Sequence, residues 1–345
     1  MAYRAGIVGG SGYIGAELLR LLATHPDLEA VLATGDRHAG TAVADLYPSL
    51  TPAYPDLVLD ALDPAALDGL DVVFLALPHG ESQRLVPDLL GRVGHLVDLG
   101  ADFRLPAASY EQWYGQPHTA PDLLARFTFG LPELFRAHLT PQTAVAAPGC
   151  YPTAAALALA PLLALGLADP TGLIVNAASG VSGRGRGLSE ASLFSEANET
   201  VHPYGLLTHR HTGEIEYALA AVQGAPVSVL FTPHLVPMTR GLVASCYAHP
   251  AVTGLSTAGL LDTYREFYAH EPFVTVLDEP PTTKATVGSN SAQLTVRYDD
   301  RTDTILAFGA LDNLVKGAAG QAIQAANLIL GLPEPTGLPV VGIMP

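Results

Sequence analysis

The sequence predicts an α/β fold in which a doubly wound parallel sheet is joined to a second α+β domain with a mainly antiparallel sheet. Three observations predict it. Short apolar strands alternate with helical patterns in the first half, a glycine-rich turn follows the first strand, and longer strands with short turns dominate the second half. The 345 residues exceed one ordinary core, and 49% of them are hydrophobic, so two packed domains are expected.

The first half contains the strand and helix signals of βαβ units. Residues 14–24 form an amphipathic helical pattern behind the first strand. Strands are predicted at residues 3–8, 28–33, 71–77 and 95–99. The last two are continuous apolar runs, which are typical of parallel strands buried on both faces. Right-handed crossovers between such strands produce a Rossmann-type doubly wound sheet.

The pattern changes near Pro148. A helix is expected over residues 153–165, and longer strands follow at residues 227–235, 241–248, 292–298 and 304–310. Their close succession favours antiparallel pairing in a separate domain. A final helix over 314–330 is rich in small residues and is expected to pack on the first domain. The predicted domains are residues 1–149 with 314–345, and residues 150–313.

Composition excludes several classes of protein. A net charge of −16 argues against nucleic-acid binding, because an acidic surface repels phosphates. The longest apolar stretch, residues 154–167, is too short to cross a membrane and contains Pro161. The first strand begins within a few residues of Met1, which leaves no room for a signal peptide. Two cysteines cannot form a disulfide framework, so we expect a cytoplasmic protein.

The glycine-rich turn predicts a dinucleotide site. It has the pattern G-x-G-x-x-G and reads Gly9-Gly10-Ser11-Gly12-Tyr13-Ile14-Gly15. Such glycines permit a tight turn and let the backbone approach a pyrophosphate at a helix N-terminus. The pattern lies directly between a strand and a helix, which is the context that the motif requires. The alternative interpretation is a plain strand-to-helix turn.

The type of dinucleotide is left open by the residues after the second strand. Asp36 would hold a ribose 2′-hydroxyl, as NAD requires, whereas Arg37 and Thr34 would hold the 2′-phosphate of NADP. Spacing alone does not decide between the two cofactors.

Cys150 is the candidate nucleophile. It lies where a strand ends and a helix begins, in the sequence Pro148-Gly149-Cys150-Tyr151-Pro152-Thr153. Backbone N–H groups at a helix start stabilise a thiolate. A free cysteine is more commonly a small buried hydrophobe, and Cys246, inside an apolar strand, fits that description.

The segment His209–Glu214 offers a candidate acid and base. A histidine suits proton transfer near neutral pH, and a nearby carboxylate orients its ring. His211 and Glu214 are three residues apart, so they share a face if the segment is helical. A solvated polar turn is the alternative, and a metal site is disfavoured because no third ligand is evident.

These residues together resemble the N-acetyl-γ-glutamyl-phosphate reductase family, which is related to aspartate-semialdehyde dehydrogenase. The resemblance runs along the whole chain. Besides the three segments above, it is carried by the segments 75–80, 100–105, 179–183 and 312–317, which read LALPHG, GADFRL, SGVSG and DNLVKG. It implies a glyceraldehyde-3-phosphate dehydrogenase-like fold.

The resemblance implies an NADP-dependent reductase with Cys150 as nucleophile and His211 as acid/base. Its substrate would be a small-molecule acyl phosphate, N-acetyl-γ-glutamyl phosphate, which passes through a thioester to the semialdehyde. Substrate binding is expected at Arg104, Arg186 and Ser179. The two arginines suit this role because arginine makes bidentate contacts with carboxylate and phosphate oxygens. Cofactor binding is expected at Ser182, Gly183, Asn313 and Lys316 in addition to the glycine turn. Surface roles are the alternative for Arg104 and Arg186.

Two positions depart from the family's pattern. Arg184 stands where the family usually has a small residue, near the expected substrate pocket. Gly213 replaces a usual proline, so we expect a looser loop around His211.

Three other functions share part of this pattern. Aspartate-semialdehyde dehydrogenase and the carrier-protein-dependent reductase of lysine biosynthesis are related enzymes, but an acidic chain suits an acidic carrier poorly. A non-catalytic NADP-binding sensor would be expected to lose the cysteine or the histidine. The long strands of the second domain offer a pairing surface, so a homodimer or homotetramer is expected.

Overall fold

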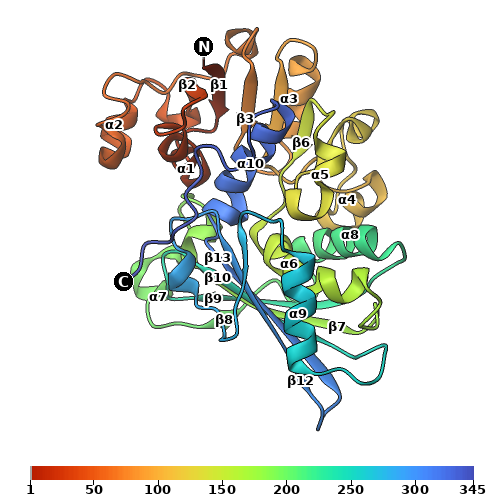
Figure 1. Cartoon of the computed structure of the whole chain (residues 1–345). Coiled ribbons are helices and arrows are strands. Elements are labelled where there is room, and N and C mark those ends of the chain that lie inside the picture. The colour runs from red at the N-terminus through yellow and green to blue at the C-terminus, as the bar shows by residue number, and fades with distance from the viewer. Residues whose placement is uncertain (1) are drawn as a thin grey trace. The chain divides into compact units, whose positions relative to one another are not determined.

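The apolar strands and helices of the chain assemble into two units in the computed structural model, which describes residues 2–345. Unit 1 runs to Pro148 and is completed by Ala318–Leu338, and unit 2 comprises Gly149–Gly317 and Pro339–Pro345. Figure 1 shows the elements of both units. No helix within residues 2–345 is both long enough and apolar enough to span a membrane.

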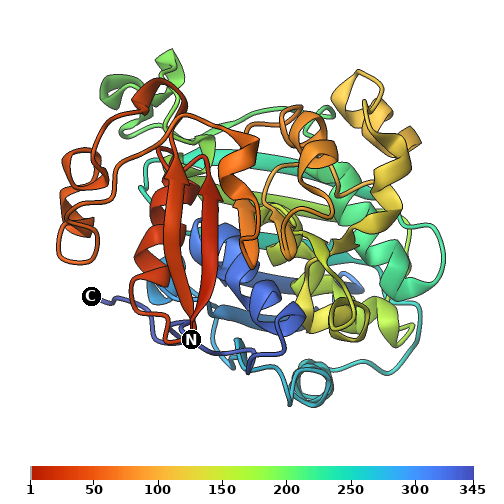
Figure 2. The ribbon, with the colours of Figure 1, turned by 90° about the horizontal axis from the view of Figure 1, so that it is seen from above.

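Unit 1 contains a six-stranded sheet in the order β2-β1-β3-β4-β6-β5, with every pair parallel. The strands are β1 Tyr3–Val8, β2 Leu28–Thr34, β3 Val72–Leu75, β4 His95–Asp98, β5 Thr128–Phe129 and β6 Ala144–Ala146. β2 and β3 flank β1, and β1 and β2 run side by side in Figure 2. Successive strands are therefore added on one side of β1 for β2 and on the other side for β3, and ligands bind at such a switch point in doubly wound sheets.

Helices connect these strands and cover the sheet. They are α1 Tyr13–Leu22, α2 Val43–Leu46, α3 Ser82–Leu89, α4 Ala107–Tyr114, α5 Pro132–Leu139 and α10 Gly320–Ile329. α10 contacts α1, α5 and β4, which confirms that the last helix packs on the first part of the chain. The predicted single helix over 314–330 is wrong at its start, because Val315–Ala319 forms a turn of π-helix before α10.

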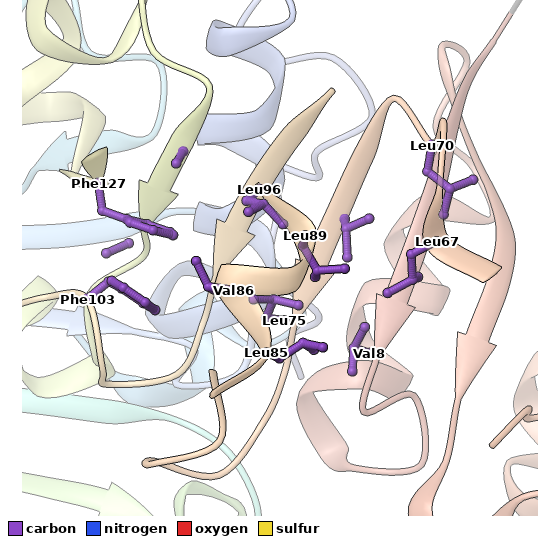
Figure 3. Packing of buried hydrophobic residues seen from close by; sticks show 13 residues of the cluster. Val8, Leu67, Leu70, Leu75, Leu85, Val86, Leu89, Leu96, Phe103 and Phe127 are labelled. Carbon is purple, nitrogen blue, oxygen red and sulfur yellow. The ribbon is translucent and has the colours of Figure 1, made fainter. Parts of the chain in front are cut away.

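The core of unit 1 lies between the sheet and α3. Val8, Leu75 and Leu96 project from three neighbouring strands, and Leu85 and Leu89 lie on one face of α3. Figure 3 shows these side chains packed together. The spacing of four residues along α3 places its leucines on the same side. Each such buried side chain contributes roughly 1.5–3 kcal/mol.

Unit 2 contains a seven-stranded sheet in the order β11-β12-β13-β10-β7-β9-β8. Its strands are β7 Leu173–Gly180, β8 His202–Pro203, β9 Val229–Val236, β10 Leu242–Ala248, β11 Val274–Val276, β12 Ala292–Asp299 and β13 Thr304–Leu311. The pairs β11–β12 and β7–β9 are parallel and the others antiparallel. The mainly antiparallel second sheet is thus confirmed, although β9 and β10 do not pair because β7 lies between them.

Four helices belong to unit 2: α6 Cys150–Ala164, α7 Phe194–Ala197, α8 His211–Gln223 and α9 Thr257–Phe267. α6 is apolar all round and almost wholly buried, as a helix covered on every side must be. It contacts α8 and α9 as well as β10, β12 and β13. This packing fixes the first residue of α6, Cys150, relative to α8.

Candidate active site

Cys150 is the first residue of α6 and is only partly buried. The chain leaves β6 at Ala146 and enters the helix through Gly149, whose extended backbone forms the N-cap. The predicted strand-to-helix junction is therefore correct. Backbone N–H groups at a helix start stabilise negative charge, which suits a thiolate at this position.

Cys246 occupies the opposite environment. It lies within β10 and has no exposed surface, as expected for a core residue. Burial raises the pKa of its thiol, which disfavours the reactive thiolate.

The start of α8 lies beside the start of α6. His211 is the first residue of α8 and Glu214 follows one turn later, so the two share a face as predicted. His211 Nε2 lies 3.9 Å from Glu214 Oε1. The other oxygen, Glu214 Oε2, accepts a hydrogen bond from the Gly149 N–H at 3.0 Å. One fully buried carboxylate thus contacts both the histidine and the residue preceding Cys150.

Two glycines make room for this arrangement. A Cβ at Gly149 would lie 2.5 Å from both Cε1 and Nε2 of His211, so the imidazole rests directly against the backbone next to Cys150. A Cβ at Gly317 would lie 2.6 Å from Cys150 Cβ. A thiol at a helix start, with an imidazole and a carboxylate beside it, can perform nucleophilic and acid/base chemistry.

A buried polar network lies in the same unit. Asn313 accepts a hydrogen bond from the Gly241 N–H at 2.8 Å and donates to Ser182 Oγ at 2.9 Å. Asp312, next to Asn313, accepts from the backbone N–H groups of Leu314 and Gly288. The predicted residues Ser182 and Asn313 are therefore brought together, and their shared hydrogen bond orients the Asn313 amide.

The other predicted residues of unit 2 differ in exposure. Ser179 is buried and its hydroxyl bonds to the Gly180 carbonyl. Lys316 is fully buried, with its ammonium 5.7 Å from the centre of the Phe273 ring. Gly183 is exposed and Arg186 is half-buried, on the segment that leaves the short 3-10 helix Val181–Arg184. Arg186 thus faces a less enclosed environment than Lys316.

The glycine turn of unit 1 fits a dinucleotide. Gly9 has a φ of 95°, and a Cβ there would lie 2.4 Å from the Ala76 carbonyl oxygen. A Cβ at Gly15 would lie 2.3 Å from the Gly9 oxygen. α1 begins after Gly12 without a side-chain cap, which leaves a backbone cradle at a helix N-terminus, as a pyrophosphate requires.

The two predicted 2′-phosphate ligands are placed differently. Thr34 is buried, and its hydroxyl accepts a hydrogen bond from the Gly9 N–H at 3.3 Å. Arg37 is exposed on the 3-10 helix Asp36–His38 that follows β2. The Thr34 side chain therefore supports the glycine turn, and the guanidinium of Arg37 is the accessible group.

Arg104 lies in unit 1 at the end of the turn that follows β4. It is buried, and its Nη2 donates to the Leu99 carbonyl at 2.7 Å. Asp102 in the same turn accepts from the N–H groups of Gly80 and Gln83. These Asp102 hydrogen bonds connect the segments 75–80 and 100–105. One nitrogen of the Arg104 guanidinium is used in the hydrogen bond to Leu99 within the same turn.

Comparison with known proteins decides the family. Two family models match: "Semialdehyde dehydrogenase, NAD binding domain" over residues 4–142 and "Semialdehyde dehydrogenase, dimerisation domain" over residues 150–313. The N-acetyl-gamma-glutamyl-phosphate reductase of Symbiobacterium thermophilum is 51% identical and 98% of each chain is covered. The reductase of the same name from Desulforudis audaxviator is 49% identical over 99% of each chain.

The chain belongs to the N-acetyl-gamma-glutamyl-phosphate reductase family.

Solved structures of aspartate-semialdehyde dehydrogenases share the fold of this family member. The enzyme II from Vibrio cholerae superposes with a TM-score of 0.73 at 15% identity, covering 96% of this chain and 99% of that one. The enzyme from Candida albicans, solved with NADP, has a TM-score of 0.69 at 16% identity, covering 95% and 99%. The predicted fold class is confirmed. As a family member, the chain is an oxidoreductase that binds a nicotinamide cofactor.

The structure accounts for both departures from the family's pattern. The Arg184 guanidinium lies 5.6 Å from the centre of the Tyr204 ring, a cation–π contact. Gly213 is buried in the first turn of α8. Position 213 therefore lies in a helix and not in a loop.

Several residues near the site were missed by the sequence interpretation. Arg240 Nη1 lies 3.4 Å from Asp312 Oδ2, and the Tyr204 hydroxyl donates to that of Tyr151 at 3.1 Å. Arg240 and Tyr204 lie outside every segment that carries a motif, and both contacts join segments far apart in the sequence. Arg240, just before β10, was the one residue whose type could have indicated this part of the site.

Proposed function

We propose that this chain reduces N-acetyl-γ-glutamyl phosphate to N-acetylglutamate semialdehyde and inorganic phosphate, using NADPH and a thioester on Cys150. The observation that supports it most is the junction of α6 and α8, where Glu214 contacts both His211 and the backbone before Cys150. Relatives named N-acetyl-gamma-glutamyl-phosphate reductase share this chain's full length.

The proposed reaction begins at the Cys150 sulfur. The thiolate attacks the acyl-phosphate carbonyl, the new C–S bond forms, and the C–O bond to phosphate breaks. A nicotinamide cofactor bound at the glycine turn would supply the hydride that reduces the thioester carbonyl, and protonated His211 donates a proton to the carbonyl oxygen so that a thiohemiacetal forms. His211, oriented by Glu214, then removes the hydroxyl proton while the C–S bond breaks, which releases the aldehyde and restores the thiolate.

Substrate oxygens require cations in a chain of net charge −16. We assign this role to Arg104 and Arg186, with Ser179 as a further substrate contact, since arginine pairs bidentately with carboxylate and phosphate. Ser182, Gly183, Asn313 and Lys316 are assigned to the cofactor side. The hydrogen bond between Asn313 and Ser182 supports a preorganised amide there.

The proposed oligomer is based on unit 2, and the proposed cytoplasmic location is based on the two thiols. We assign the glycine turn that binds the dinucleotide to unit 1, and we assign catalysis, the remaining cofactor contacts and pairing to unit 2, whose matching family model is described as a dimerisation domain. A row of apolar side chains crosses its sheet in register, from Leu230 through Ile174 and Tyr247 to Leu306. Leu230 is 50% exposed and Ile174 38%, which favours a homodimer or homotetramer. Neither cysteine is part of a disulfide bond, as in cytoplasmic proteins.

The substrate is tested in the reverse direction, by following NADPH formation from NADP, phosphate and an aldehyde. We expect kcat/KM for N-acetylglutamate semialdehyde to exceed that for aspartate semialdehyde at least about 100-fold, since a substrate lacking the correct charged contacts loses several kcal/mol. Cys150→Ala should abolish turnover, and Cys246→Ala should not. Preference for aspartate semialdehyde, or a need for a carrier protein, would contradict the assignment.

The preference for NADP is tested at Arg37. A charged hydrogen bond to the 2′-phosphate contributes roughly 1.5–3 kcal/mol, so Arg37→Ala should raise the Kd of NADPH about 10- to 150-fold. The Kd of NADH should hardly change, because that cofactor lacks the phosphate. Equal losses for the two cofactors would make Arg37 structural, and a wild-type preference for NADH would favour Asp36 as the ribose ligand.

A further inference from the structure

His209 lies two residues before His211 and has a different environment. Its ring is surrounded by four others, those of Tyr151, Tyr204, Phe231 and His211, with centroid separations from 4.9 to 5.7 Å. All four contacts are edge-to-face, an arrangement that holds a ring in one orientation.

The start of α8 lacks an ordinary cap. Its N-cap residue is Arg210, which has a helical backbone and makes no capping hydrogen bond through its side chain. The first N–H groups of a helix have no partner within the helix. His209 serves two of them: its Nδ1 accepts from the His211 N–H at 3.2 Å, and its carbonyl oxygen accepts from the Thr212 N–H at 3.0 Å.

This hydrogen bond specifies the protonation state of His209. An Nδ1 that accepts from a backbone N–H carries no proton, so the neutral ring holds its proton on Nε2. Burial lowers the pKa of His209 to about 3, and the neighbouring His211 and Arg210 act in the same direction, whereas Glu214 opposes them. Tyr151 and Tyr204 face the same ring and are neutral, because burial raises the pKa of both. His209 is therefore neutral near neutral pH.

We infer that His209 is a positioning residue, which caps α8 through Nδ1 and thereby holds His211 against Gly149 and beside Glu214. The inference rests on the proposed role of His211 as acid/base. It separates the two histidines of the His209-Arg210-His211 segment: one transfers the proton, and the other fixes where that transfer occurs. Without the cap, the first turn of α8 frays and the His211 imidazole loses its fixed position.

Two variants separate the acceptor from the ring. His209→Asn keeps an oxygen acceptor close to the position of Nδ1 but removes the ring, whereas His209→Phe keeps a ring but removes the acceptor. We expect His209→Phe to lower kcat at least about tenfold with little change in KM, since misplaced catalytic groups mainly slow chemistry. His209→Asn should recover most of that loss. His249→Phe, at an exposed histidine beyond β10, should match the wild type.

The kinetic outcomes are decisive in both directions. Wild-type kcat in His209→Phe would overturn the inference, because the acceptor would then be dispensable. Equal losses in His209→Asn and His209→Phe would also overturn it, because ring packing would be the cause.

A second readout does not depend on the substrate. Amide hydrogen exchange of the segment 207–216 should be faster in His209→Phe by on the order of fivefold, the effect of one lost hydrogen bond, and near the wild-type rate in His209→Asn. An unchanged rate in His209→Phe would overturn the inference. If the wild type fails to turn over N-acetylglutamate semialdehyde, the proposed function is wrong, and this exchange measurement still decides whether His209 caps α8.

Discussion

At the scale of single residues, the thiols of Cys150 and Cys246 differ in secondary structure and in exposure to solvent. Cys150 begins a helix and is partly exposed, whereas Cys246 is enclosed in β10. Prolines and a glycine flank the first, whereas the second lies in the mostly apolar segment Leu242–Ala248, so the local sequence already separates them. The contact between His211 and Gly149 has no such local signature, because 61 residues, Cys150 through Arg210, lie between them.

Gly149 gives a prediction at this scale. Its backbone, with a φ of −72°, is accessible to alanine, so Gly149→Ala should fold. The added methyl group would lie 2.5 Å from the His211 ring and must displace it. We expect kcat to fall roughly 100-fold, the effect of moving a catalytic group by about 1 Å, while thermal stability and cofactor affinity stay near the wild type.

Gly259→Ala is the matched control, because Gly259 is an exposed residue of α9 whose added Cβ would meet the Ser256 hydroxyl at 3.2 Å. It should leave kcat unchanged. A Gly149→Ala variant with wild-type kcat would mean that the position of His211 is not critical.

At the scale of elements, β4 and α3 meet around a buried carboxylate. Asp98 ends β4, and its Oδ1 accepts hydrogen bonds from the Ser82 hydroxyl at 2.7 Å and the Gly100 N–H at 2.9 Å. Burial, with a smaller contribution from Asp102, raises the pKa of Asp98 to about 6. Ionisation of this side chain is therefore less favourable in the folded protein than in water.

Asp98 makes stability depend on pH. Because its folded pKa is raised from 3.8 to about 6, the stability it contributes is complete below 3.8 and is lost as pH rises through about 6. Asp98→Asn keeps the Oδ1 acceptor without the titration. The free energy of unfolding of the variant should therefore rise relative to the wild type between these values, by on the order of 3 kcal/mol.

Denaturant unfolding at several pH values measures this difference. Asp88→Asn is the control, since Asp88 is exposed on the same helix α3; its difference from the wild type should vary little over the interval. A pH-independent difference for Asp98→Asn would show that burial does not raise the pKa of this carboxyl.

At the scale of the whole molecule, the sheet of unit 2 has two unlike faces. Side chains of β10 alternate between buried and partly exposed positions, with Cys246 on the covered face and Tyr247 on the other. α6 contacts β10 and β13 and covers one face. The in-register row from Leu230 to Leu306 places apolar side chains on the opposite face, where a second copy would bury them.

Light scattering after size-exclusion chromatography tests the assembly. The wild type should have a mass of two or four times 35.9 kDa. Ile174→Glu should shift it toward the monomer, because an interface that buries an unpaired carboxylate is destabilised by several kcal/mol. Val252→Glu, at an exposed position outside the row, should not. A monomeric wild type would contradict the proposed pairing.

Much of this molecule could be predicted from local sequence. β1 and β10 lie at or within one residue of their predicted bounds, and the glycine turn opens α1. Strands of this kind have strong period and composition signals. The pairing order of the second sheet could not be predicted in this way, since β7, which lies between β9 and β10 in the sheet, is separated from β9 by 48 residues of sequence. Register between distant strands leaves no local trace.

The sequence by itself determined the two-domain α/β fold, the glycine turn and Cys150 at a helix start, because each depends on residues within one turn or one strand. Only the tertiary structure decided how the site is held together, with Glu214 bridging two helix starts and Asn313 hydrogen-bonded to Ser182. These contacts join side chains from different elements. They exist only after the helices and the sheet have packed, so no spacing along the chain encodes them.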